Sequence, residues 1–106
     1  YDALMDAFRS GTRPDAILTY SDIAAAQLCR CAADFGLKVP EDIAVIGHGD
    51  KDFAGFMQPP IASINGLEEE VGKSVRDLLV NRLHHSDSPR RHCRIEAKFI
   101  KRESAG

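Results

Sequence analysis

The sequence contains no tryptophan, and aromatic residues occupy only 7% of its 106 positions. It has no apolar run approaching the roughly 20 residues that a membrane-spanning helix needs, so we expect no membrane partner. Its formal charge of −2 provides no overall attraction to nucleic acid. Three cysteines without a CxxC pair argue against a disulfide framework and favour a reducing compartment, so we expect the protein in the cytoplasm.

Hydrophobic residues make up 43% of the chain, which is enough for one modest core. The length is too short for two ordinary domains, so the chain is one globular unit or a piece of one. It starts at Tyr1 without an initiator methionine or a leader peptide, as a fragment would. The spacing of Leu4, Met5 and Phe8 predicts the end of a helix over residues 1–10.

Two short apolar runs, residues 16–20 and 43–46, predict strands that are buried on both faces of a parallel sheet. The segment between them predicts a helix over residues 22–35 with its apolar side chains on one stripe. Strand, helix and strand in this order form a βαβ unit, which places the chain in the α/β class.

The second half of the chain predicts one more strand, a long helix and a final strand. Residues 61–64 form a short apolar run, and Asn65-Gly66-Leu67-Glu68 resembles a capping box that opens a helix to about Leu83. Residues 95–99 alternate apolar and charged side chains, as a half-exposed strand does.

Polar residues follow the first predicted strand. Ser21 and Asp22 lie where open α/β sheets bind small ligands, and a hydroxyl and a carboxylate suit a polar ligand. The alternative is simple helix capping, for which Ser and Asp are preferred whether or not a ligand binds. The local sequence favours capping and leaves an additional ligand contact open.

The second predicted strand runs into Gly47-His48-Gly49-Asp50. Its two glycines permit a left-handed turn or a close approach of the backbone. The segment lacks the G-x-G-x-x-G spacing and an immediately following helix, so an ordinary turn is favoured over a dinucleotide site.

The sequence offers little for catalysis or metal binding. Ser21, Asp22 and His48 could form a triad on paper, but no serine stands in a G-x-S-x-G elbow. Cys29 and Cys31 point to nearly opposite sides of a helix, which favours packing over metal binding. The remaining candidate ligands are His84, His85, Asp87, His92 and Cys93. Their spacing matches no familiar zinc pattern, so we expect no enzyme, no metal and no cofactor.

Basic residues are concentrated near the end of the chain. From Lys73 to Arg102 there are nine Lys or Arg against three Asp or Glu. Contact with nucleic acid is conceivable, but aromatic side chains that could stack on bases are not interleaved with these charges. A solvated basic face is therefore the favoured interpretation.

Several segments together resemble the C-terminal part of a LacI/GalR-family transcriptional regulator, in order and over nearly the whole chain. They are Pro14-Asp15-Ala16-Ile17, Ser21-Asp22-Ile23-Ala24-Ala25, Gly36-Leu37-Lys38-Val39-Pro40-Glu41-Asp42-Ile43-Ala44-Val45-Ile46-Gly47, Pro59-Pro60-Ile61, Gly72 and Lys101-Arg102-Glu103-Ser104. The resemblance implies a fragment of a periplasmic-binding-protein-like (type I) effector domain, a three-layer sandwich around a parallel sheet. Residues 1–64 would belong to its C-terminal lobe, and residues 65–100 would be a returning helix and strand.

The same resemblance implies a repressor that binds a sugar or sugar acid and acts as a homodimer. Operator DNA would be a partner only through a helix-turn-helix domain that this chain does not include. The implied effector-binding residues are Leu18, Tyr20, Ser21, Asp22, His48, Gly49 and Asp50. The implied dimer-interface residues are Ala26, Cys29, Arg30, Phe53, Phe56 and Met57.

Two positions depart from the common pattern of the family. Gly49 stands where many members carry an aspartate that binds a ligand hydroxyl, and His48 stands where they carry an aromatic residue. Loss of a carboxylate removes repulsion toward an anionic ligand. The Gly-x-Gly-Asp version is similar to the branch that responds to gluconate, so we expect a sugar acid as effector.

An alternative is that the protein is a periplasmic sugar-binding protein of a transport system. A signal peptide upstream would support this alternative, whereas a helix-turn-helix upstream would support the repressor. By the resemblance, the apolar stripe from Leu67 to Leu83 normally packs on the other lobe. In an isolated fragment we expect that stripe to dock non-natively, pair with another copy or be mobile.

Overall fold

The computed structural model describes residues 2–11 and 13–106, so Tyr1 of the predicted first helix lies outside the described part. The elements in chain order are α1 (Asp2–Arg9), β1 (Ala16–Leu18), α2 (Asp22–Asp34), β2 (Ala44–His48), the 3-10 helix η1 (Asp52–Phe56), β3 (Ala62–Asn65), α3 (Glu68–His84), β4 (Lys98–Ile100) and the 3-10 helix η2 (Glu103–Ala105). The chain thus alternates strands and helices, and the predicted α/β class is confirmed.

The four strands form one sheet in the order β1-β2-β3-β4. The first three are parallel, with Leu18 opposite Ile46 and His48 opposite Ile64. Only β4 is antiparallel to its neighbour β3. Because β1, β2 and β3 run in the same direction, their carboxyl ends meet at one edge of the sheet.

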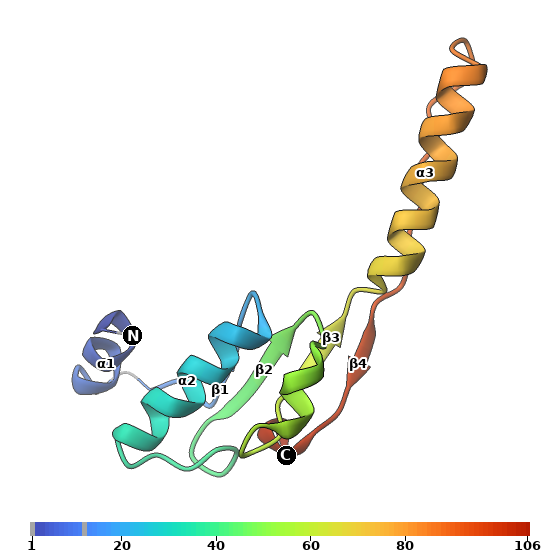
Figure 1. Ribbon diagram of the computed structural model, residues 1–106. Helices are drawn as coiled ribbons and strands as arrows, with labels where there is room; N and C mark the ends of the chain where they lie inside the picture. Colours follow the sequence, from blue (N-terminus) through green and yellow to red (C-terminus); the bar gives the residue numbers. More distant parts are fainter. Residues whose placement is uncertain (1, 12) are drawn as a thin grey trace.

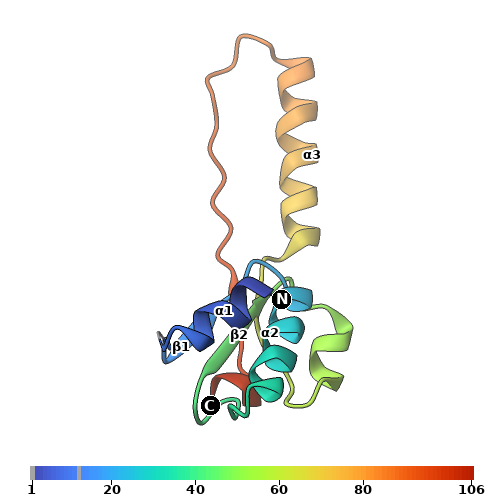
Figure 2. The ribbon, with the colours of Figure 1, turned by 90° about the vertical axis from the view of Figure 1, so that its left-hand side faces the viewer.

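The core lies between the sheet and the helices that cover one of its faces. Helix α2 and η1 lie on the same side of the sheet (Figures 1 and 2). Leu28 of α2 is buried there together with Val45 of β2. Helix α1 joins this cluster because the Phe8 ring packs against Phe35, with 5.7 Å between ring centroids.

The prediction that the first two strands are buried on both faces is wrong. β1 is an edge strand, and its Ala16 and Leu18 side chains are exposed. In β2, Val45 is buried toward α2, whereas Ile46 is only half-buried and His48 is exposed. An apolar run identifies a strand, but its burial depends on whether another element covers each face.

A long arm leaves this body and returns to it. Helix α3 projects from the end of β3, and the chain runs back beside it from residue 86 to residue 97 (Figures 1 and 2). No residue of α3 is buried. The radius of gyration is 18.5 Å, compared with about 13 Å for a compact chain of this size. The apolar stripe of α3 therefore does not dock on the body, and it exposes Val71, Val75, Leu79 and Leu83.

Both ends of the arm differ from their predicted form. Leu67, in a left-handed conformation with φ 53°, occupies the N-cap of α3 and supplies no side-chain cap, so the predicted capping box is wrong. Asn65 still belongs to β3, and its Oδ1 accepts a bond from the Leu67 N–H at 2.8 Å. The last strand pairs only from Lys98, because Lys98 lies opposite Asn65, where β3 ends.

Candidate functional site

A shallow concavity lies at the edge where the three parallel strands end. It has a volume of about 450 Å³ and is lined by Leu18, Thr19, Tyr20, His48 and Ile64. Leu18, Tyr20 and His48 were predicted from the sequence to meet a ligand, and the structure brings these three together. Thr19 and Ile64 were missed. The sequence could have identified Ile64 by its place at the end of the predicted strand over residues 61–64, since parallel strands end at the same edge of a sheet and Ile64 lies opposite His48.

The turn after β1 is held firmly against β2. The backbone N–H of Thr19 donates to the Ile46 carbonyl at 2.8 Å. Its hydroxyl bonds to the same carbonyl at 3.1 Å and to the Ser21 carbonyl at 2.8 Å. These bonds fix the backbone on either side of Tyr20, whose ring extends into solvent beside the concavity.

Ser21 caps α2. Its backbone is extended, and its Oγ accepts a bond from the Ala24 N–H at 3.2 Å. Ser21 does not line the concavity. The capping interpretation therefore accounts for this side chain in the structure.

Asp22 is directed into the protein. Asp22 is buried, with only 1% of its surface exposed. One carboxylate oxygen accepts from the Ser63 hydroxyl at 2.5 Å and the other from the Lys51 N–H at 2.7 Å. A Cβ at position 47 would overlap this carboxylate, which explains the glycine there. Asp22 thus ties α2 to β3 and to the loop after β2.

Gly49 and Asp50 form the tight turn that follows β2. Gly49 has φ +111° and Asp50 has φ 49°, so both adopt left-handed backbone conformations. A Cβ on Gly49 would lie 3.8 Å from a carboxylate oxygen of Asp22, and neither turn residue lines the concavity.

The Asp50 carboxylate is also engaged internally. One oxygen accepts from Arg102 Nη2 at 2.7 Å and the other from Asn65 Nδ2 at 3.0 Å. Burial alone would raise the pKa of Asp50, but the bonds from Arg102 and Asn65 and the charge of Arg102 outweigh it and lower that pKa below its ordinary value. Arg102 and Asn65 were not predicted as site residues, because each is distant from Asp50 in sequence.

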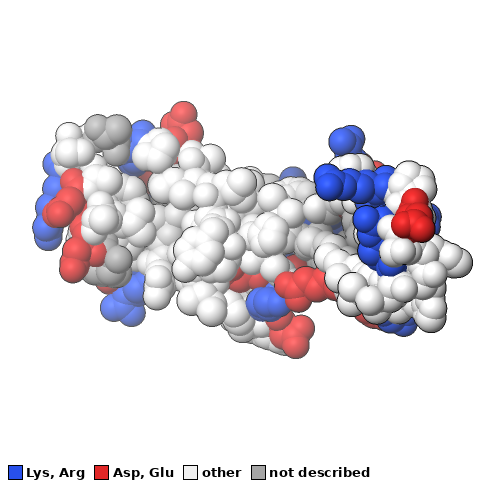
Figure 3. Space-filling view, turned by 90° about the horizontal axis from the view of Figure 1, so that it is seen from above, with Lys and Arg blue, Asp and Glu red and all other residues white. Residues whose placement is uncertain are grey.

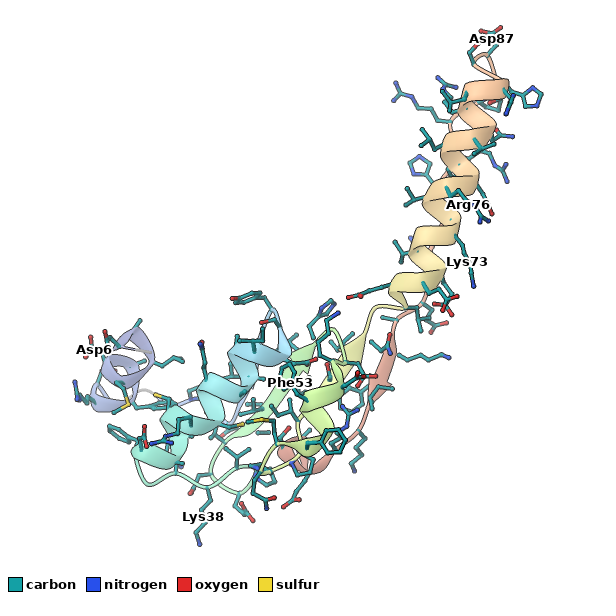
Figure 4. The ribbon with its side chains drawn as sticks, viewed as in Figure 1. Asp6, Lys38, Phe53, Lys73, Arg76 and Asp87 are labelled. Atoms are coloured by element: carbon teal, nitrogen blue, oxygen red, sulfur yellow. The ribbon has the colours of Figure 1, made fainter. Side chains whose placement is uncertain are left out.

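The residues predicted for the dimer interface lie on α2 and on η1 with its following residue. Phe56 is 89% exposed, and Phe53 lies on η1 beside α2 (Figure 4). Ala26 and Met57 are half-buried against the core, and Arg30 pairs with Asp34 at 2.9 Å. Cys29 is buried, and burial raises the pKa of its thiol and of the Cys31 thiol. The two thiols are packing residues.

The other sequence candidates lie on the arm. Figure 3 shows lysine and arginine side chains gathered on the arm. Arg90, Arg91 and Arg94 of the segment that returns beside α3 are exposed. Within residues 2–11 and 13–106, His, Cys, Asp and Glu side chains form no group of three that could hold a metal ion. In the same described part, no helix has both the length and the apolarity to cross a membrane.

The chain and its fold match a known domain family. The chain belongs to the periplasmic binding protein-like domain family, which it matches over residues 1–105. It is 30% identical over 105 residues to the ribose operon repressor of Escherichia coli K12, covering 99% of this chain and 32% of that protein. It is 31% identical over 98 residues to the HTH-type transcriptional repressor PurR of Aliivibrio fischeri ES114, covering 92% and 29% respectively.

Solved structures agree with this assignment. The transcriptional regulator CelR in complex with cellobiose superposes with a TM-score of 0.83 at 30% identity, over 99% of this chain and 33% of that chain. A dimeric Lac repressor lacking 11 C-terminal residues superposes with a TM-score of 0.84 at 24% identity, over 99% and 38%, and supports the fold. The chain spans about a third of the length of the curated relatives it matches.

Proposed function

We propose that this chain is the effector-binding and dimerisation part of a LacI-type transcriptional repressor that responds to a sugar or sugar acid. The observation that carries the proposal is the concavity at the carboxyl ends of β1, β2 and β3, where α/β sheets bind small ligands. Its relatives are repressors and not enzymes. We accordingly propose a non-catalytic, cytoplasmic sensor.

The division into body and arm supports a two-lobed whole protein. Residues 1–64 would form most of one lobe, and residues 65–100 would contribute a helix and a strand to a second lobe. The exposed apolar side chains of α3 need a partner, and the remainder of a longer protein would provide it. A DNA-reading helix-turn-helix outside this chain would then respond to closure of the two lobes on the effector.

The lining of the concavity favours an acidic effector such as gluconate. None of the described residues that line it carries a carboxylate. Asp22 and Asp50, the nearest candidates in sequence, each use both oxygens in internal bonds. The lining instead offers the imidazole of His48 and the phenol hydroxyl of Tyr20 as hydrogen-bond donors, so an anionic ligand would meet no like charge there.

The proposed homodimer uses the outer face of α2 and η1. Phe56 and the half-buried Phe53 and Met57 provide apolar area, and α2 contributes the exposed Arg30. Exposed aromatic residues, Met and Arg are the residue types enriched in protein interfaces. Buried Cys29 would support this face from within.

Titration calorimetry on the whole natural protein tests the proposal. The panel contains gluconate, a ketogluconate and neutral hexoses, with Tyr20→Ala and His48→Ala as site variants and His85→Ala on the arm as the matched control. We expect a sugar acid to bind, and each site variant to weaken binding about 10-fold or more, the effect of about 1.4 kcal/mol.

His85→Ala should leave the affinity unchanged. Tight binding of a neutral sugar without a response to either sugar acid would contradict the proposal of an acidic effector. It would still support the proposal that the protein is a sugar sensor. Failure of every carbohydrate to bind would contradict the proposed function.

A further inference from the structure

One carboxylate connects the two segments that join the body to the arm. Asn65 is the last residue of β3 before the chain leaves for the arm, and Arg102 follows β4 shortly after the chain returns. Both donate to Asp50, Asn65 at 3.0 Å and Arg102 at 2.7 Å. Arg102 also donates to the Ile61 carbonyl at 2.9 Å, which anchors its guanidinium on the body.

The next residue, Lys51, reaches the arm itself. Its Nζ lies 3.0 and 3.1 Å from the two carboxylate oxygens of Glu68, the first residue of α3. The Lys51 N–H is bonded to buried Asp22, so its backbone is fixed to the body. Among the residues that the structure describes, Lys51 and Glu68 form the only ion pair that joins the body to α3.

The chain between these anchors is suited to act as a hinge. Only Gly66 and the left-handed Leu67 separate Asn65 from Glu68. The His48 imidazole, which lines the concavity, lies over Gly66, with Cε1 and Nε2 both 3.9 Å from the position that a Cβ on this glycine would occupy. The same side chain therefore faces the ligand site and the hinge.

We propose that Asp50 and Lys51 form a latch that sets the angle between body and arm, and that His48 couples the latch to the occupied concavity. Asp50 is then a positioning residue and makes no contact with the effector. The coupling rests on the proposed function. The latch itself rests only on the contacts of the turn after β2 with Glu68 of the arm and with the two segments that join the body to the arm.

The Asp50–Arg102 and Lys51–Glu68 ion pairs would have different roles in the latch. The Asp50 and Arg102 side chains are only 16% and 23% exposed, so their ion pair is shielded from solvent and salt. This pair would stay formed while the arm moves. Lys51 and Glu68 are 52% and 71% exposed. Such a pair is weak and is screened by salt, so it can open and close as the arm moves.

Charge exchange tests the latch in the whole natural protein. The variants are Lys51→Glu, Glu68→Lys and the double exchange. The matched control exchanges Lys73 and Glu69, which pair at 2.7 Å within α3 with similar exposure. Spin labels on Cys93 of the arm and on a Lys38→Cys substitution in the body report their separation by pulsed electron resonance, with other accessible cysteines replaced by serine. Figure 4 shows Lys38 at the far side of the body from the arm.

Without ligand, we expect each single reversal to change the distance distribution, and the double exchange and the control to retain the native one. The single reversals should also change the effector dissociation constant about 1.5- to 5-fold at low salt and less at high salt, the range of exposed pairs. Unchanged distances in both single variants, or an equal change in the Lys73–Glu69 exchange, would overturn the latch.

The two proposals fail separately in this experiment. If no carbohydrate binds the wild-type protein, the proposed function fails while the ligand-free distances still judge the latch. If the effector binds and the variants shift the distances without changing its affinity, the coupling through His48 is overturned. A further variant, Asp50→Asn, should alter the distances together with the affinity. A loss of affinity at native distances would instead identify Asp50 as a direct ligand contact.

Discussion

At the scale of single residues, the carboxylate of Asp22 shows how a side chain that looks available in the sequence becomes an internal support. It accepts bonds from β3 through Ser63 and from the turn after β2 through the Lys51 N–H. Both donors would lose their partner if the carboxylate were removed, and an unpaired buried polar group is costly. The side chain therefore stabilises the edge that carries the concavity.

Replacing Asp22 by alanine should lower the free energy of unfolding by about 1.5–3 kcal/mol, the typical contribution of bonds to a charged group. Urea titration of the whole natural protein measures this. Asp52→Ala is the control, because Asp52 is exposed on η1, and it should stay within about 0.5 kcal/mol of wild type. Equal effects of the two substitutions would show that Asp22 is not a support.

The lowered pKa of Asp50 predicts a pH dependence with a definite sign. Because the folded pKa lies below the unfolded one, the stabilisation is complete above the ordinary aspartate pKa and is lost as the pH falls through the lowered value. Asp50→Asn should cost about 1–3 kcal/mol near neutral pH. Urea titrations from about pH 7 to about pH 3 should show this difference from wild type shrinking with acidity. A constant difference would contradict the assignment.

At the scale of elements, Ser21 determines where α2 begins, since its Oγ satisfies the Ala24 N–H. Ser21→Ala should reduce stability by about 1 kcal/mol, and Ser21→Asp should retain most of it, because aspartate caps as well as serine does. Thermal or urea unfolding of the three proteins provides the comparison. If aspartate destabilised as much as alanine, the role of Ser21 would lie outside capping.

The elements also show what the sequence could and could not predict. Local patterns were sufficient for α2, whose apolar stripe, serine cap and following glycine lie within a few residues of one another. They could not reveal that β1 has exposed side chains, because burial depends on which element covers a strand. They also could not reveal that the Asp50 carboxylate, which the family resemblance places among the effector-binding residues, pairs with Arg102, because Arg102 is 52 residues away and becomes a neighbour only in the folded chain.

At the scale of the whole molecule, the chain is a body with a concavity at one edge of its sheet and a long, exposed arm. Helix α3 and the segment that returns beside it project away from the body (Figures 1 and 2), which explains why the chain is so extended. The turn after β2 lies between them and contacts both segments that connect body to arm. In the function and the latch that we propose, a ligand at the edge would bind close to the place where the two parts would move.

X-ray diffraction from the whole natural protein, crystallised with the carbohydrate that binds most tightly in calorimetry, tests the central claim most directly. We expect ligand density against Leu18, Tyr20 and His48, with Asp22 and Asp50 still in their internal bonds. Ligand density elsewhere on the protein, with the carboxyl ends of β1, β2 and β3 filled only by solvent, would contradict it.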